Sequence, residues 1–320
     1  MIARRAALAG GVALLAGGAA ARAASRMTLA IGAKAGTPPD AICRAFAPFL
    51  SQRLDGAEIA IRNLPGEAGL VALNALAAAP PTGATVGWVS APNLPARMVD
   101  HAADGLLGRL TLIGAIEREP IAFVSPAAAP LDSVQDIVRR AAEDADAVPI
   151  GTPPAGSPPH LAALRLQLLT QTRLNIVTFP SALAARQAVI AGNVAAAALG
   201  LSDAIGALRE DKLAGIGIAA RARAGMLPDL PVLNEAGVPL SATIRRGLAV
   251  PVGVPDAVVQ RLTQALRAIT ADPAFREHAD ETGFLATWID GPTWTAQITA
   301  ERQELAKLWA SEPWLQSGGG

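Results

Sequence analysis

A six-residue segment occurs twice in this chain in nearly the same form, once in each half. The two copies are Ala35-Gly36-Thr37-Pro38-Pro39-Asp40 and Ala155-Gly156-Ser157-Pro158-Pro159-His160, and an apolar segment with helical spacing follows each. Each copy predicts a glycine turn, a Thr or Ser N-cap, prolines in the first helical turn, and then a helix. A helix begins with unpaired N–H groups and the positive end of its dipole, which suit an anion. The repeat therefore predicts a cleft that closes on an anion from two sides.

Strand-like and helix-like segments alternate around these turns. The expected strands are residues 28–31, 57–61, 85–89, 148–151, 174–178, 195–199, 214–219 and 247–251. The expected helices are 67–78, 131–142, 158–170, 182–191 and 202–209, with helical stripes over 42–50 and 258–269, a helix from Pro273 and a last one from Pro292 to about Trp309. Such alternation predicts an α/β fold with a mostly parallel sheet and helices on both faces.

The length of 320 residues predicts two domains. We expect the chain to cross between two lobes twice, near 121–125 and near 247–251, so that the two crossings form a hinge. Lobe 1 is then residues 24–123 plus 248–320, and lobe 2 is residues 124–247. The ligand cleft is expected between the lobes.

The first 23 residues have the pattern of a secretory signal peptide. Arg4 and Arg5 precede an apolar run over residues 6–15, and Ala21-Arg22-Ala23 matches an A-x-A cleavage site. We expect cleavage after Ala23, with Ala21 as the rival position; Arg4-Arg5 leaves a twin-arginine route open. An uncleaved anchor is the alternative, but the run is too short and too rich in Gly and Ala to span a membrane stably. The mature chain is therefore expected to be exported to the periplasm.

Composition excludes several classes of function. Removing residues 1–23 leaves 24 basic and 27 acidic residues, a net charge of −3. No long basic run occurs, which argues against nucleic acid and anionic membrane surfaces as partners. Cys43 is the only cysteine and is expected to be a buried thiol. No histidine has Cys, His or carboxylate neighbours at metal-ligand spacing, so we expect no metal site and no cofactor.

Three stretches resemble the Bug-type solute-binding proteins that serve tripartite tricarboxylate transporters, and the resemblance spans essentially the whole mature chain. They are Asn63-Leu64-Pro65-Gly66 with Gly69 and 77–83; Pro228-Asp229-Leu230-Pro231 with Asn234-Glu235-Ala236-Gly237-Val238-Pro239; and Gly247-Leu248 with Pro251, Gly253, Pro255, Leu262 and Ala271-Asp272-Pro273. The stretch from Pro228 to Pro239 resembles the P-D-V-P-T-x-x-E-A-G-V-P signature of that family and is the most specific match.

The resemblance implies a type II periplasmic binding protein fold and no enzymatic activity. It implies a monomer that closes over a small ligand, often a carboxylate, and delivers it to the membrane subunits of a transporter. The family loop after the first strand is matched at Ala35, Gly36 and Asp40, and its second-lobe loop at Gly156, His160 and Leu161. A family motif with an aromatic hydroxyl and a base is here Phe179-Pro180-Ser181, and the chain has no tyrosine. We therefore expect a less polar pocket on the second lobe.

The repeated turns supply the main candidate ligand donors. Because proline has no N–H, the available main-chain donors belong to Ala35, Gly36, Thr37 and Asp40 in one copy and to Ala155, Gly156, Ser157 and His160 in the other. The hydroxyls of Thr37 and Ser157 add two further donors. The alternative is a pair of ordinary capped helices without a ligand, because Ser/Thr-Pro helix starts are common.

Further candidates flank these turns. Asp40 has capping-box spacing from Thr37, and we expect it to fix the loop rather than touch an anion; holding an amino group or a water is the alternative. Lys34 would attract a carboxylate or be a solvated loop lysine, and His160 would donate to the ligand or to the loop, or be purely structural. Ligands gather at the carboxyl ends of strands in open α/β sheets, which adds Ser90, Asn93, Gly200 and Ser202.

Two rival functions stay open at this point. An exported hydrolase would use Ser157 or Ser90 with a histidine, but no G-x-S-x-G elbow occurs and no carboxylate is placed to orient His160. A ligand sensor that docks on a receptor kinase is the other, and the sequence does not separate it from transport.

Overall fold

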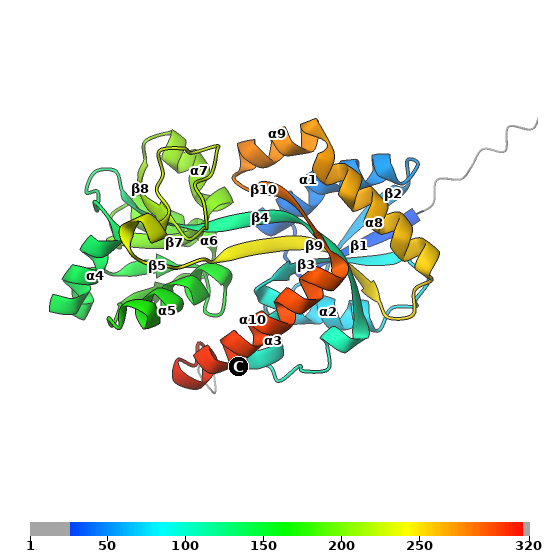
Figure 1. The fold of residues 1–320 in the computed structure, drawn as a ribbon, viewed down its shortest axis with the longest axis horizontal. Coiled ribbons are helices and arrows are strands. Elements are labelled where there is room, and N and C mark those ends of the chain that lie inside the picture. The colour runs from blue at the N-terminus through cyan, green and yellow to red at the C-terminus, as the bar shows by residue number, and fades with distance from the viewer. Residues whose placement is uncertain (1–25, 316–320) are drawn as a thin grey trace, which may run out of the picture.

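The computed structural model describes residues 26–315, and within that range one mixed sheet runs through the molecule with helices on both faces (Figure 1). The strands are β1 (Arg26–Ile31), β2 (Glu58–Asn63), β3 (Thr85–Ala91), β4 (Leu110–Pro126), β5 (Ile150–Thr152), β6 (Ile176–Thr178), β7 (Ala196–Gly200), β8 (Leu213–Ile218), β9 (Thr243–Pro251) and β10 (Leu285–Asp290). Their order across the sheet is β2-β1-β3-β9-β4-β7-β5-β6, and β8 and β10 also pair with β4.

Helices follow most strands. They are α1 (Pro38–Arg53), α2 (Leu70–Ala77), α3 (Asn93–Asp100), α4 (Val134–Glu143), α5 (Pro158–Thr170), α6 (Ala182–Ile190), α7 (Leu201–Arg209), α8 (Asp256–Ala271), α9 (Pro273–Thr282) and α10 (Gly291–Ser311). Short 3-10 turns lie at η1 (Glu67–Gly69), η2 (Leu107–Arg109), η3 (Ala145–Ala147) and η4 (Leu233–Ala236). No helix in the range 26–315 is both long enough and apolar enough to cross a bilayer.

The expectation of a mostly parallel sheet is wrong. β1 pairs in parallel with β2 and β3, and β5 pairs in parallel with β6 and β7, as the β-α-β units require. β4, however, runs antiparallel to β7, β8, β9 and β10, and β9 runs antiparallel to β3. The reason is that β4 and β9 are long strands that carry the chain out of one lobe and back again.

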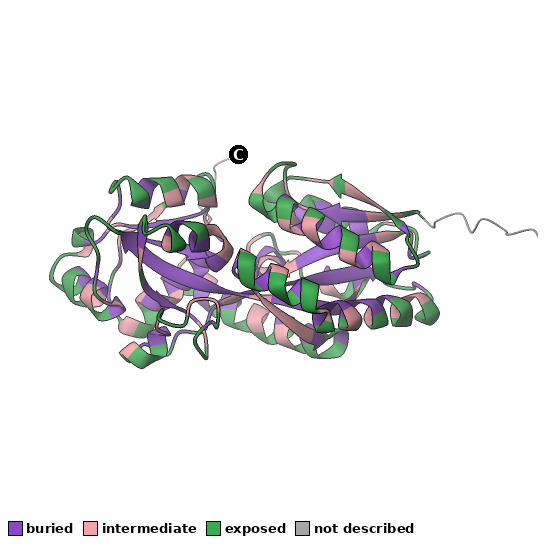
Figure 2. Ribbon diagram, turned by 90° about the horizontal axis from the view of Figure 1, so that it is seen from above, coloured by how far each residue is buried: buried purple, intermediate pink, exposed green. Residues whose placement is uncertain are grey.

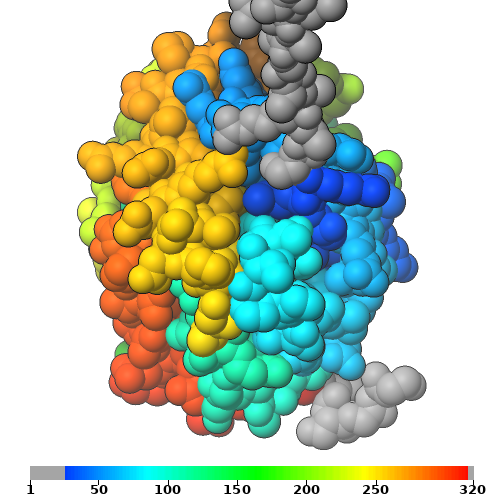
Figure 3. Space-filling view, turned by 90° about the vertical axis from the view of Figure 1, so that its right-hand side faces the viewer, coloured from blue at the N-terminus to red at the C-terminus, as the bar shows by residue number. Residues whose placement is uncertain are grey.

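These two strands join the lobes. β4 pairs with β9 as far as Pro120 and with β7 and β8 from Ile121 onward, and β9 joins β4 at Thr243. Figure 3 shows the end of the molecule that holds the first lobe, where N-terminal and C-terminal segments lie side by side. The expected lobe boundaries at 123/124 and 247/248 lie within a few residues of these changes of partner and stay predictions.

Each lobe buries an apolar layer on both faces of its sheet, with the strands buried and the outer helix faces exposed (Figure 2). In the first lobe α1, α8 and α9 cover one face, and α2, α3 and α10 cover the other. In the second lobe α4 and α5 pack opposite α6 and α7. Cys43, on the inner face of α1, is fully buried as expected, and burial raises the pKa of its thiol.

Polar caps explain where several helices begin. The Oγ of Ser133 accepts the N–H of Asp136 at 3.2 Å at the start of α4, and the Oγ of Ser181 accepts the N–H of Ala184 at 3.1 Å at the start of α6. The sequence prediction placed these two helices within three residues of their observed starts. It missed α3, β10 and most of β4, and the expected signal peptide at 1–23 lies outside the described residues.

Candidate functional site

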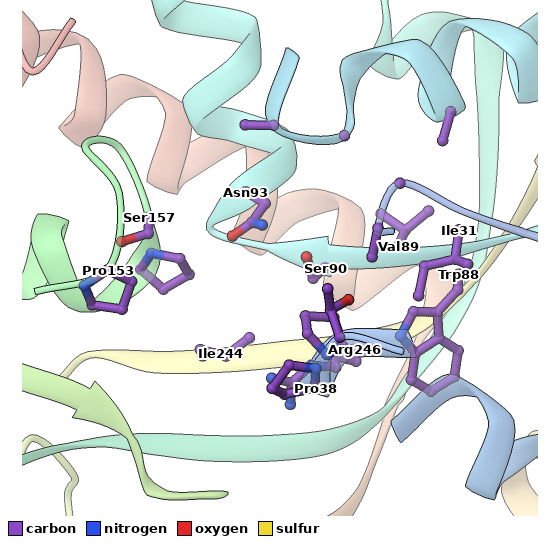
Figure 4. A pocket seen from close by; sticks show the side chains of 18 of the residues that line it. Ile31, Pro38, Trp88, Val89, Ser90, Asn93, Pro153, Ser157, Ile244 and Arg246 are labelled. Atoms are coloured by element: carbon purple, nitrogen blue, oxygen red, sulfur yellow. The ribbon is translucent and has the colours of Figure 1, made fainter. Parts of the chain in front are cut away.

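A cavity of about 440 Å³ lies between the lobes, and both repeated helix starts reach it (Figure 4). The first lobe contributes Lys34 and Thr37 from the loop before α1, and the second lobe contributes Ser157 at the start of α5. Arg246 lines it from β9. The two copies of the repeat therefore face one shared space.

The predicted site residues divide into two groups. Lys34, Thr37, Ser90, Asn93 and Ser157 line the cavity, whereas Ala35, Gly36, Asp40, Gly156, His160, Phe179, Gly200 and Ser202 do not. The contacts of the second group explain what those residues do instead.

Asp40 holds the first loop in place. Gly36 has a left-handed backbone (φ 77°), which glycine adopts without a steric penalty, and its N–H donates to the Oδ2 of Asp40 at 2.8 Å. Arg44 donates to the same oxygen at 2.9 Å. The guanidinium of Arg44 and these other donors hold the pKa of Asp40 near 2, despite its burial. Asp40 is therefore a buried carboxylate that fixes the loop, which is the role the sequence favours.

His160 takes the same position in the second copy. Gly156 is again left-handed (φ 73°), and its N–H donates to the Nδ1 of His160 at 3.4 Å. Burial lowers the pKa of His160 to about 4, so the ring is neutral at pH 7. The ring lines a different hollow, together with Trp314. His160 is thus placed as a structural acceptor rather than as a ligand donor.

Fewer main-chain amides are free for a ligand than the sequence implies. The N–H groups of Gly36 and Gly156 bond to Asp40 and His160, that of Thr37 bonds to the carbonyl of Lys34 at 3.3 Å, and that of Ser157 bonds to the carbonyl of Pro154 at 3.0 Å. The other four expected donors belong to residues that do not line the cavity, namely Ala35, Asp40, Ala155 and His160. None of the eight expected main-chain donors is therefore both free and at the cavity.

The side chains best placed to bind a ligand are Ser157 and Asn93. The Oγ of Ser157 and the Oδ1 of Asn93 are buried and have no hydrogen-bond partner among residues 26–315. Figure 4 shows Ser157 on the second-lobe side of the cavity and Asn93 and Ser90 on the first-lobe side. Because an unpaired buried polar group costs free energy, a ligand that bonds to these atoms would be stabilised. Lys34 adds an exposed ammonium at the same cavity.

Most of the remaining wall is apolar. Ile31, Trp88 and Val89 lie together on one side in Figure 4, and Ile244 projects from β9 on another. Prolines of both helix starts add further apolar surface. A ligand that fills this cavity therefore needs a hydrocarbon portion as well as a polar end.

Arg246 is a cavity-lining residue that the sequence prediction missed. Its side chain is buried between two glutamates of β4, with Nη1 3.3 Å from Glu117 Oε2 and Nη2 2.5 Å from Glu119 Oε2. Burial raises the pKa of Glu117 to about 7, and the charge of Arg246 opposes that rise. The available signal was the pair of glutamates two residues apart, which project from the same face of a strand. Arg246 is held by protein carboxylates and is not a free cation for a ligand.

Gly200 and Ser202 support this cluster rather than the cavity. Ser202 donates its N–H to Glu119 Oε1 at 2.9 Å and its hydroxyl to the same oxygen at 2.7 Å. A Cβ on Gly200 would overlap that oxygen and lie 3.1 Å from the Cδ of Glu119, so the close approach requires glycine. Asp203, one residue further on, does line the cavity and was also missed.

Phe179 does not line the cavity, and the serine and histidine of the hydrolase hypothesis do not meet. Phe179 packs against the second-lobe core, and its neighbours Pro180, Ser181 and Ala182 line the cavity. Ser157 and His160 line separate cavities, and neither Ser157 nor Ser90 bonds to a histidine within the described part of the chain. Over the same residues no three His, Cys, Asp or Glu side chains gather as a metal site.

Comparison with known proteins identifies the family. Residues 42–307 match the family described as "Tripartite tricarboxylate transporter family receptor". A UPF0065 protein of Bordetella bronchiseptica is 26% identical over 286 residues, which cover 88% of this chain and 84% of that protein.

Solved structures share the fold. R. palustris Rpa4515 with adipate aligns with a TM-score of 0.80 and 21% identity over 91% of this chain and 98% of that one. MatC (Rpa3494) from Rhodopseudomonas palustris with bound malate aligns with a TM-score of 0.75 and 22% identity over 89% and 98%. Because the family match covers most of the chain, this protein belongs to the tripartite tricarboxylate transporter receptor family.

Proposed function

We propose that this protein is exported to the periplasm, is cleaved near Ala23, and captures a small organic acid in the cavity between its lobes. It acts as a monomer and delivers the acid to the membrane subunits of a tripartite tricarboxylate transporter. Family membership supports the role of receptor. The ligands named for the similar solved structures, adipate and malate, support the carboxylate.

The observation that carries this proposal is the shared cavity. Thr37 at the start of α1 and Ser157 at the start of α5 line the same space although they belong to different lobes. A ligand that bonds to Ser157 and Asn93 at once contacts both lobes, and its binding energy then favours the closed arrangement. A carboxylate oxygen accepts from the Ser157 hydroxyl, and Lys34 supplies a positive charge nearby. The Oδ1 of Asn93 is an acceptor, so it takes a hydrogen bond from a ligand hydroxyl or from a water that bridges it to the acid.

The apolar wall narrows the class of acid. Burial of each methylene contributes about 0.8 kcal/mol, whereas a hydroxyl placed against Ile31, Trp88 or Val89 would lose its hydrogen bonds to water. We therefore propose an acid with a hydrocarbon body, of the adipate type, in preference to a compact hydroxy acid of the malate type.

Isothermal titration calorimetry of the purified mature protein tests this. Adipate and longer or aromatic monocarboxylates and dicarboxylates are expected to bind at micromolar concentration or tighter, and malate at least tenfold more weakly. Malate binding more tightly than every acid with a hydrocarbon body would contradict the ligand class. The absence of binding by any acid in the panel would contradict the function.

Ser157→Ala tests the site itself. Loss of one hydrogen bond to a charged ligand costs about 1.5 kcal/mol, so we expect the affinity for the best acid of the panel to fall about tenfold. Ser311→Ala, in the exposed last turn of α10, is the matched control and is expected to bind as the wild type does. Equal affinities for the two variants would place the ligand elsewhere.

A further inference from the structure

A second cavity, of about 530 Å³, lies on the other side of the hinge strands β4 and β9 from the cleft and shares no lining residue with it. Along β9, Ile244 and Arg246 line the cleft, whereas Thr243 and Arg245 line this second space. Successive side chains of a strand project from opposite faces, so the two cavities lie on opposite sides of the hinge. We call the second one the rear cavity, and its lining comes from both lobes: from β4, β9, α5, α10 and residues 220–223.

The lining of the rear cavity carries more positive charge than its own carboxylates balance. It contains five arginines and two glutamates. Arg245 pairs with Glu301, and Arg223 pairs with Glu235 outside the lining. Arg118 and Arg221 form no ion pair with any residue between 26 and 315.

The half-buried guanidinium of Arg118 is the centre of this imbalance. It projects from β4 close enough to Arg245 and Arg221 for both to act on it: burial and these two positive charges lower its pKa. Burying a cation among cations is unfavourable unless an anion compensates. No side chain within the described range supplies that anion to Arg118.

Two buried guanidinium nitrogens in the same cavity also lack partners. The Nη2 of Arg165 and the Nε of Arg245 are shielded from solvent and donate no hydrogen bond to residues 26–315. The nearest carboxylate oxygens to Arg165 Nη2 are those of Glu304 at 3.7 Å and Glu301 at 3.9 Å, which is beyond hydrogen-bond distance. Planar guanidinium groups with free N–H donors are the usual partners of phosphate and carboxylate oxygens.

We propose that the rear cavity is a binding site for a compact dianion, of which inorganic phosphate is the simplest example. Arg118 and Arg245 contact it from the hinge strands, and Arg165 and Arg221 contact it from the second lobe. Its oxygens accept N–H donors of the accessible guanidinium groups of Arg118 and Arg221, and its charge offsets the excess of arginines. The site is separate from the cleft and rests on different residues, so it does not depend on the function proposed above.

Calorimetric titration of the purified mature protein with inorganic phosphate at pH 7.5, against sodium chloride of equal ionic strength, tests the proposal. We expect saturable binding of phosphate by the wild type and an affinity at least tenfold weaker in Arg118→Gln. Arg221→Gln, which changes an exposed side chain and does not threaten folding, is expected to weaken phosphate binding in the same direction. Arg26→Gln, at an exposed arginine paired with Glu58, is the control and is expected to bind phosphate as the wild type does.

The carboxylate panel used for the cleft separates the two sites. Arg118→Gln is expected to bind the best acid of that panel with unchanged affinity, and Ser157→Ala is expected to lose that acid while it still binds phosphate. Phosphate binding that is no stronger than the chloride control, or that survives in both Arg118→Gln and Arg221→Gln, would overturn the rear site. Phosphate binding lost in Ser157→Ala would assign it to the cleft and would also overturn the proposal.

Discussion

The carboxyl group of Asp203 lies in the cleft, although a bound acid would carry the same charge. It sits in the first turn of α7, where burial raises its pKa to about 7 and the nearby charge of Glu119 adds to that rise. Arg246 and Arg186 act in the opposite direction. The side chain therefore changes charge close to neutral pH, and it is neutral on the acid side of that point.

We predict that the affinity for adipate falls as the pH rises from 6 to 8. Below pH 7 Asp203 is protonated and does not repel the ligand; above pH 7 both are anionic in a cavity of low dielectric. A fall of roughly tenfold is expected, which corresponds to two like charges about 10 Å apart at an effective dielectric constant of about 20. Calorimetry at pH 6, 7 and 8 measures it, and Asp203→Asn is expected to remove most of the dependence.

Asp229→Asn is a matched control for this titration. Asp229 lies in the exposed loop after β8 and away from the cavity, so its variant should keep the pH dependence of the wild type. If Asp203→Asn kept it too, the titrating group would be another one, and Glu117 with its pKa near 7 would be the next candidate.

At the scale of the element, the two repeated helix starts share a geometry but not a response to acid. In both, the residue four positions after the left-handed glycine accepts the glycine N–H. Asp40 does so as a carboxylate whose pKa is lowered to about 2, and His160 does so as a neutral ring whose pKa is lowered to about 4. The acceptor at the first helix start therefore stays ionised in mild acid, whereas the acceptor at the second is lost when His160 takes up a proton.

We predict that His160 makes the fold less stable as the pH falls from 6.5 to 4. Its folded pKa is below the unfolded value of 6.5, so the unfolded state takes up the proton first and gains population. The free energy of unfolding should fall by up to about 3 kcal/mol across that window. His160→Asn keeps an acceptor for Gly156 and does not titrate, so urea unfolding of the variant should lack this loss.

The test compares the pH dependence of the free energy of unfolding between the wild type and His160→Asn. Glu117 and Asp203 have raised pKa values and favour the folded state as the pH falls, but they do so equally in both proteins. Asp40→Asn is the counterpart in the first copy; because Asp40 stays ionised in both states above pH 5, its variant should show the pH slope of the wild type between 7 and 5. An identical slope in His160→Asn would refute the role assigned to His160.

Helices and strands could be predicted where the residues that determine them are neighbours in the sequence. The helix expected at 158–170 is α5 at the same bounds, because its start is determined by three consecutive residues, Ser-Pro-Pro. β4 was missed over most of its length, because Glu117, Arg118 and Glu119 interrupt its apolar pattern. The charges of Glu117 and Glu119 are buried only because Arg246 lies opposite them, and that partner is 129 residues from Glu117 in the chain.

The same distinction applies to the candidate site. The sequence located the two loops that meet at the cavity and left His160 open between the ligand and the loop, where it accepts the N–H of Gly156. It assigned Gly200 and Ser202 to the ligand, whereas both lie against Glu119. Which face of a helix start meets the cavity depends on how the lobes dock, and no local pattern encodes that docking. Asp203 and Arg246 were missed for the same reason.

At the scale of the whole molecule, the lobes touch at more than the two crossing strands. Leu161 and Leu164 of α5 pack in one cluster with Leu305 and Leu308 of α10, and Trp314 completes it. Gly156 lies against Arg97 and Trp314 of the first lobe, so close that an added Cβ would be 2.5 Å from Arg97 Nη2. The second helix start is therefore a contact between lobes as well as a wall of the cleft.

Helix α7 is tied to the hinge through Glu119. Glu119 lies on β4 and is fully buried. Its carboxylate accepts two hydrogen bonds from Ser202 and forms an ion pair with Arg246. This connection links the second lobe to both crossing strands. It is possible only because Gly200 leaves room for the carboxylate.

Gly200→Ala tests that connection. The backbone at Gly200 is extended (φ −60°), so alanine is not excluded by conformation, but its Cβ would displace the Glu119 carboxylate from Ser202 and Arg246. We predict a loss of about 2–4 kcal/mol in the free energy of unfolding, measured with urea. Gly206 lies in the same helix, exposed and with nothing within 4 Å of an added Cβ, so Gly206→Ala should instead stabilise the protein by about 0.5–1 kcal/mol. If both substitutions stabilised it equally, the close approach of Glu119 to α7 would not exist in solution.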